Sequence, residues 1–137
     1  MNRVWKMMAV VMLAWHVITT VHAEEEPAAP QIQYYDLDPP FVTNYDVSTN
    51  KLKFVKATVA VRATSQAAIT EFMSHEPMIR HEIVMLLSRQ TEETMSSSAG
   101  QEAIRTEALK LVQDALKQET GSTQIDDLLF TEFVVQR

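Results

Sequence analysis

Alternation of apolar and polar side chains is clearest over Lys51–Arg62 and predicts a β-strand there. Leu52 and Phe54 fall on the opposite parity from the apolar residues that follow, which indicates either a β-bulge or a short stretch buried on both faces. We expect one face of this strand to pack on the core through Val55, Ala57, Val59 and Val61, and the other to carry Lys56, Thr58 and Arg62.

Two further strands are expected, one before this strand and one at the end of the chain. Tyr34–Leu37 is a short first strand, which Pro39-Pro40 should end because proline donates no hydrogen bond to a sheet. The last strand begins near Ile125. Its segment Leu128–Gln136 carries apolar side chains on both faces, so we expect it to be covered on both sides.

Helical signals occupy the region between the second and third strands. Ser65 is a suitable N-cap for a short helix through Phe72, and Pro77 fits the first turn of a second helix. Apolar residues at helical spacing predict that this second helix buries Ile79, Ile83, Leu86 and Leu87.

A loop or helix start is expected at Thr91–Gly100, followed by the longest helix at Gln101–Glu119, with Gly121 as its C-cap. The order strand, strand, helix, helix, helix, strand predicts an α+β domain, a short sheet with helices packed on it. The buried face of the longest helix should contain Ile104, Ala108, Leu111, Val112 and Ala115.

The first residues of the chain have the layout of an export signal. Arg3 and Lys6 give a basic start, and Val21-His22-Ala23 offers a small-x-small cleavage site. The apolar run Met7–Val21 is shorter than the roughly 20 residues of a membrane span, yet an uncleaved anchor stays open beside a cleaved signal peptide. We therefore expect a signal peptide or short anchor helix at 1–23, a flexible linker at 24–33 and one exported domain at 34–137.

The charge and composition exclude several classes of function. The chain has 12 basic and 18 acidic residues, a formal charge of −6, which becomes −8 without Arg3 and Lys6. Nucleic acids and anionic membrane surfaces need basic patches, so neither is an expected partner. There is no cysteine, which excludes disulfides and thiolate nucleophiles, and the domain must be held by its core.

No motif predicts an active site, a metal site or a cofactor site. His81-Glu82 begins like a zinc-protease helix, but Met85 stands where the second histidine is needed, and His75 falls on another side of the helix. Two glycines are too few for a nucleophile elbow, a phosphate-binding loop or a dinucleotide fingerprint. The methionines in or beside the helices serve either as core filler or as an adaptable docking surface, namely Met73, Met78, Met85 and Met95.

Five segments occur in an order and spacing that resemble the FliL family, the flagellar basal-body-associated proteins of bacteria. The resemblance covers nearly all of Tyr34–Gln136. Two departures are the short apolar run, where the family has a clear membrane span, and Gln101, where it tends to have lysine. The segments are DPPFVTN at Asp38–Asn44, LKFVKATVAV at Leu52–Val61, PMIR at Pro77–Arg80 in a helix that ends at Leu87-Ser88, Gly100-Gln101-Glu102 with Ile104-Arg105, and LFTEFVVQ at Leu129–Gln136.

This resemblance implies a stomatin-like periplasmic domain that is not an enzyme and needs no cofactor or metal. It implies a homo-oligomeric ring around the motor stator that supports flagellar rotation, swimming and swarming motility and chemotaxis. The partners would be stator and basal-body proteins, with no nucleic acid and no small-molecule substrate. The location would be the periplasmic side of the inner membrane at the flagellar basal body, or the soluble periplasm if the signal is cleaved.

Two other functions stay open at this stage. One keeps the fold in a soluble periplasmic paralogue that acts as a binding or scaffold module for another envelope complex. The other is a periplasmic hydrolase with an unfamiliar site, for which the sequence offers no nucleophile and base. For the interface we select Phe41, Phe130 and Phe133, with ordinary core packing as the competing role, and Arg80 and Arg105, which fall at matching family positions.

Overall fold

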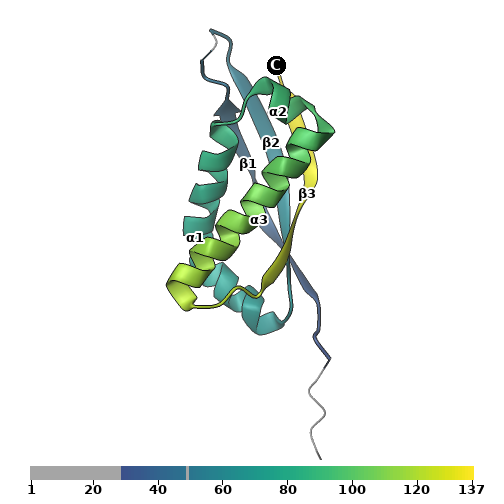
Figure 1. The fold of residues 1–137 in the computed structure, drawn as a ribbon, viewed down its shortest axis with the longest axis vertical. Helices are drawn as coiled ribbons and strands as arrows, with labels where there is room; N and C mark the ends of the chain where they lie inside the picture. The colour runs from purple at the N-terminus through teal and green to yellow at the C-terminus, as the bar shows by residue number, and fades with distance from the viewer. Residues whose placement is uncertain (1–28, 49) are drawn as a thin grey trace, which may run out of the picture.

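A three-stranded antiparallel sheet in the order β1-β2-β3 carries all the helices on one face (Figure 1). The computed structural model describes residues 29–48 and 50–137, so the expected segment 1–23 and the first part of the linker lie outside the described residues. The α+β class is confirmed. The elements are β1 at Gln33–Tyr45, β2 at Lys53–Ala63, α1 at Gln66–Ser88, α2 at Glu92–Ser96, α3 at Ser98–Thr120 and β3 at Ile125–Gln136.

The first strand is longer than expected, because β1 continues past Pro39-Pro40 to Tyr45. Leu37 pairs with Val59 and Phe41 pairs with Ala57, so the residues between Leu37 and Phe41 bulge out opposite Thr58 alone. The prediction that the prolines end the strand is wrong because β1 is an edge strand, and a bulge needs no ladder donor from them.

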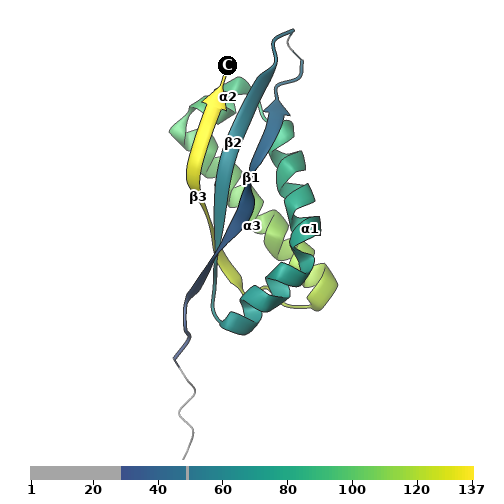
Figure 2. The ribbon, with the colours of Figure 1, turned by 180° about the vertical axis from the view of Figure 1, so that it is seen from behind.

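The two expected helices around Pro77 form one helix, α1, with Pro77 in its interior. The prediction of a separate helix start is wrong because burial on both sides of the proline, at Phe72 and Ile79, holds the two halves to the same sheet. Figure 2 shows α1 changing direction along its length, which is the effect expected of a proline inside a helix. The Ser65 cap is confirmed, since its hydroxyl accepts a hydrogen bond from the N–H of Ala68 at 3.2 Å.

The segment expected as a loop or helix start at 91–100 contains the short helix α2 and the first turn of α3. Thr91 and Ser97 cap the two helices by accepting from the backbone N–H groups three residues on, and Met95 between them is fully buried. Gly121 has φ of 75° and ends α3 as predicted, in the left-handed conformation that glycine adopts without strain.

The core lies between the inner face of the sheet and the helices. The predicted core face of β2 is confirmed, while Leu52 lies outside the strand and Phe54 faces away from the helices on a regular register, so no bulge occurs there. In α3 the buried residues are Ile104, Ala108, Val112 and Leu116, whereas Leu111 and Ala115 are only half-buried.

The last strand, β3, is an edge strand, and no described helix covers the face of it that points away from the core. Val134 points away from the helices and is 47% exposed, and Val135 and Phe133 on the inner face are half-buried. The prediction that β3 is covered on both sides is therefore wrong for the chain on its own, since all the described helices pack on the same face of the sheet (Figure 2).

Candidate interaction surface

Arg80 joins helix α1 to the bulge of β1. Its guanidinium carbon lies 4.3 Å from the centre of the Phe41 ring, and Nη2 donates to the backbone carbonyl of Pro39. The guanidinium also lies 3.5 Å from the Glu76 carboxylate one turn earlier in α1. A cation over an aromatic ring and a charged hydrogen bond to the backbone both favour this position of the bulge against α1.

A second contact strengthens the same junction. The Tyr35 hydroxyl donates to Glu76 Oε2 at 2.7 Å, and the Tyr35 ring packs edge-on against Phe72 at a centroid distance of 5.8 Å. The hydrogen bond to the Glu76 carboxylate, helped by burial, raises the pKa of the Tyr35 phenol above its ordinary value. Tyr35 and Arg80 thus hold the edge strand β1 to α1 from the two sides of Glu76.

Arg105 performs the same task at the opposite edge of the sheet. Its guanidinium pairs with both oxygens of Glu102 at 2.9 and 2.6 Å, and Nη1 reaches Asp127 Oδ1 at 2.7 Å. Nη1 also donates to the backbone carbonyl of Leu128 at 3.1 Å. These contacts raise the pKa of Arg105 and lower that of the Glu102 carboxyl, each mainly through the hydrogen bonds between the two side chains.

The contacts at Leu128 identify which backbone groups face outward. Its carbonyl accepts from Arg105 and its N–H donates to Asp127 Oδ1 at 2.9 Å, so both groups point away from β2. Gln113 of α3 likewise donates to the carbonyl of Ile125 at 2.8 Å. Side chains therefore occupy the outer backbone groups of the first part of β3, which closes that part of the edge to a further strand.

The residues selected from the sequence divide into three groups. Phe41 is 2% exposed and lies in the core, so on this chain it offers no surface to a partner. Phe130 and Phe133 are half-buried near the β3 edge, with ring centroids 5.0 Å apart. Arg80 and Arg105 make the contacts described above within the chain. Their sequence positions carry no sign of those contacts, because each partner backbone lies far away in sequence, Pro39 by 41 residues and Leu128 by 23.

The outer face of the sheet presents a surface that the sequence did not single out. Val42 and Val134 flank Lys56 in one row across the sheet and Phe54 lies in the neighbouring row, with exposures of 63% for Val42, 47% for Val134 and 36% for Phe54. Lys56 pairs with Glu132 at 3.0 Å beside them. We call Val42, Phe54 and Val134 the outer patch. Scattered exposed apolar residues are common on proteins, whereas these three lie close together on a sheet face that no described helix covers.

No metal-binding cluster occurs among residues 29–48 and 50–137. No group of three histidine or acidic side chains there is placed to hold a metal ion. Among these same residues, no helix is both long and apolar enough to cross a membrane.

Comparison with known proteins gives the family of this chain. The family described as "Flagellar basal body-associated protein FliL" matches residues 34–136. The chain belongs to the FliL family. A curated relative is the flagellar protein FliL of Aquifex aeolicus (strain VF5), which is 29% identical over 102 residues, or 74% of this chain. The match covers 60% of the length of that relative.

FliL membership confirms the resemblance found in the sequence. It makes the chain a member of a flagellar basal-body-associated family and gives no support to a hydrolase. The matched range begins one residue into β1 and ends with β3, so it spans the described helices and strands and includes both arginine contacts.

Proposed function

We propose that this protein is a non-enzymatic component of the flagellar basal body that associates with the motor stator and supports flagellar rotation, swimming and swarming motility and chemotaxis. The observation that carries the proposal is the family match over residues 34–136. In the described residues, arginine side chains of the helices bind the backbone of both edge strands and one sheet face is not covered by helices, which suits a scaffold.

We further propose a homo-oligomeric ring in which the outer patch contacts the next copy or the stator. Covering Val42, Phe54 and Val134 would remove apolar area from water, at about 25 cal/mol per Å². The edges of the sheet are less suited to direct strand addition where Arg80 and Arg105 already bind the backbone. We propose that Phe130 and Phe133, which are half-buried at the β3 edge, contact the neighbouring copy beside the outer patch. Arg80 and Arg105 would hold the edge strands in position at this interface.

The proposed location is the periplasmic side of the inner membrane, with residues 1–23 as signal or anchor, 24–33 as linker and 34–137 as a stomatin-like domain. The mass of the protein from the membrane and periplasmic fractions tests the location. A species that begins at Glu24 would exclude the anchor, and an intact chain in the membrane fraction would exclude cleavage.

The functional test is deletion of the gene, which should impair swimming or swarming under viscous load, followed by rescue with variants. Wild-type protein should rescue motility and co-purify with stator proteins. Val134→Lys should fold normally, because the side chain is exposed, yet should fail to rescue. The matched control is Val47→Lys in the β1–β2 loop, where the side chain is 79% exposed, and this variant should rescue. Full motility of the deletion strain would contradict the proposal.

A second candidate is a soluble periplasmic FliL paralogue that serves as a scaffold for another envelope complex. The short apolar run at Met7–Val21 favours it. It predicts normal motility in the deletion strain together with the cleaved species in the periplasm, so the two experiments above separate the candidates.

A further inference from the structure

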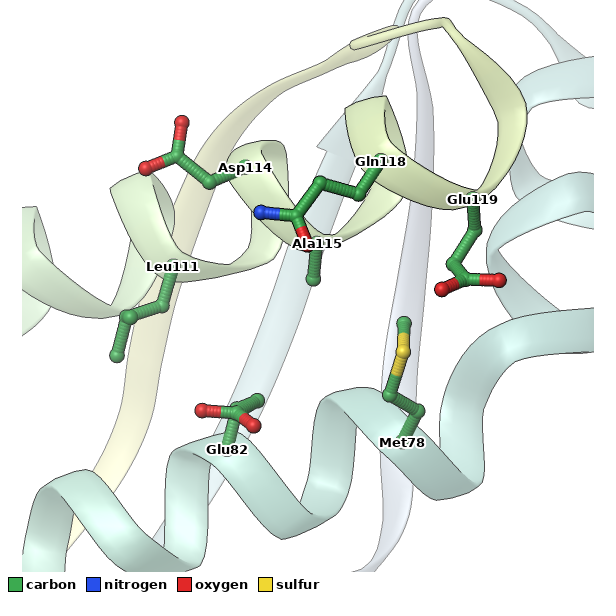
Figure 3. Close-up of a pocket in the computed structure, with 7 residues that line it drawn as sticks. All are labelled: Met78, Glu82, Leu111, Asp114, Ala115, Gln118 and Glu119. Atoms are coloured by element: carbon green, nitrogen blue, oxygen red, sulfur yellow. The ribbon is translucent and has the colours of Figure 1, made fainter.

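A groove runs between helices α1 and α3 on the side of the molecule away from the sheet. Its volume is about 290 Å³, and its apolar wall consists of Met78 from α1 with Leu111 and Ala115 from α3. Figure 3 shows Met78 pointing from α1 toward α3, and Leu111 and Ala115 pointing back toward α1. Leu111 and Ala115 were expected in the core. They are only half-buried because they line this groove between the two helices.

Carboxylates line the same groove. Glu82 from α1 and Glu119 from α3 both point into it, whereas Asp114 points away and pairs with Lys110 at 2.6 Å (Figure 3). In the part of the chain that the structure describes, neither Glu82 nor Glu119 has an ion-pair or hydrogen-bond partner. No lysine or arginine lines the groove, so the two charges face it uncompensated.

The wall extends along α1 beyond the groove itself. Met78, Glu82 and Met85 stand at i, i+4 and i+7, so they share one stripe of the helix, and Met85 is 47% exposed. Just past the end of α1, the C-cap residue Arg89 pairs with Glu107 of α3 at 3.1 Å and bridges the two helices. The surface therefore combines two methionines of α1 with the Glu82 carboxylate between them, and a salt bridge limits it at one end.

We propose that this groove docks a cationic amphipathic helix from another protein, with its apolar residues on Met78, Leu111 and Ala115 and its lysine or arginine side chains on Glu82 and Glu119. A groove between helices with apolar anchors at helical spacing is a known mode of helix recognition. Methionine adapts its shape to varied apolar partners. The opposite charge of the partner follows from the two unpaired carboxylates. This inference does not depend on the flagellar function.

The probe is a synthetic leucine–lysine peptide with helical amphipathic spacing, and its binding to the full chain is measured by fluorescence anisotropy. A leucine–glutamate peptide of the same pattern serves as the opposite-charge probe and should bind at least about tenfold more weakly. The double variant Glu82→Gln, Glu119→Gln should weaken binding of the leucine–lysine peptide by about tenfold, because it removes two ion pairs at the surface.

The control removes the same charge elsewhere. Asp36→Asn with Glu93→Gln alters the outer sheet face and α2, where both carboxylates are exposed, and should leave binding within about twofold. Ala115→Trp should block the groove and abolish binding, with circular dichroism as the check on folding. Equal weakening by the two double variants would mean general attraction between opposite charges and would overturn the site. Equal binding of the two peptides, or no binding of the leucine–lysine peptide, would also overturn it.

Discussion

Arg105 donates a hydrogen bond to the backbone carbonyl of Leu128 at 3.1 Å, so a helix side chain takes the place of a neighbouring strand at this edge of the sheet. The same guanidinium binds Asp127, which in turn accepts from the Leu128 N–H. At the other edge, Arg80 donates to the carbonyl of Pro39. Each edge strand is thus tied to a helix by one arginine, which makes the arginines central to the stability of the sheet.

Replacement of Arg105 by methionine should destabilise the domain by about 1–3 kcal/mol, because charged hydrogen bonds to Asp127 and to the backbone are lost. Urea unfolding gives the free energy of unfolding. Arg89→Met is the matched control, since Arg89 and Glu107 are both more than half exposed and such pairs contribute at most about 1 kcal/mol. Equal losses of stability in the two variants would show that the Arg105 contact at the sheet edge contributes no more than an exposed surface ion pair.

Replacement of Arg80 by lysine tests the geometry of the guanidinium rather than its charge. Lysine cannot lie flat over Phe41 and donate to the Pro39 carbonyl at once, so we expect a loss of about 1–2 kcal/mol although the charge is retained. The same change at Arg89 should leave the unfolding midpoint in urea almost unaltered. An Arg80→Lys protein as stable as the wild type would show that a point charge suffices at this position.

Local signals predicted the parts of the fold that depend on neighbouring residues. The alternation in β2, the Ser65 cap and the Gly121 cap were all visible because their physical causes lie within a few residues. The predictions based on proline were wrong at both sites. At Pro39-Pro40 and at Pro77 the local preference to stop is overridden by packing on the sheet, which only the tertiary structure contains.

The candidate surface was predictable only in part. Arg80 and Arg105 were selected by their place in the family pattern, but their backbone partners lie across the fold and leave no local sign. The apolar residues of β3 suggested a strand buried on both faces. The outer face is instead bare on the single chain, so those residues indicate either an oligomer contact or a half-buried edge.

Gly100 gives a case in which helix propensity and packing disagree. Propensity alone predicts that Gly100→Ala stabilises α3 by up to about 1 kcal/mol. A Cβ atom at this position would lie 2.1 Å from the carbonyl oxygen of Thr94, which belongs to the backbone of α2 and cannot easily move. We therefore expect a loss of about 1–3 kcal/mol, the usual cost of overpacking. A higher melting temperature for this variant than for the wild type would contradict the close approach of α2 to α3.

Lys53 makes the stability of the domain depend on pH. Its side chain is 8% exposed and lies 2.7 Å from both Asp46 and Glu92, which joins the end of β1 to α2. The hydrogen bond from Lys53 lowers the pKa of the Asp46 and Glu92 carboxyls, and those carboxyls raise the pKa of Lys53. The folded state therefore favours the ionised form of these two carboxyls more than the unfolded state does. Their contribution to the free energy of unfolding is present above the ordinary pKa values of 3.8 and 4.5, and it is lost as the pH falls through the lowered pKa values of the folded state. The Lys53 contribution is also stabilising, but its pH dependence runs the other way: it is present below the ordinary value of 10.5 and is lost as the pH rises through the raised pKa of the folded state.

Replacement of Glu92 by glutamine isolates this acid dependence. The variant should be less stable than the wild type at about pH 7, where Glu92 is ionised, and the difference should shrink at about pH 3, where protonation has weakened the wild-type pair as well. Urea midpoints measured across this range give both values. The control is Glu93→Gln on the next residue of α2, whose side chain is exposed, so the urea midpoint of this variant should stay close to that of the wild type. If the loss of stability in Glu92→Gln is the same at both pH values, the ionised Lys53–Glu92 pair does not stabilise the fold. Helix α2 would then be held to the sheet by the burial of Met95.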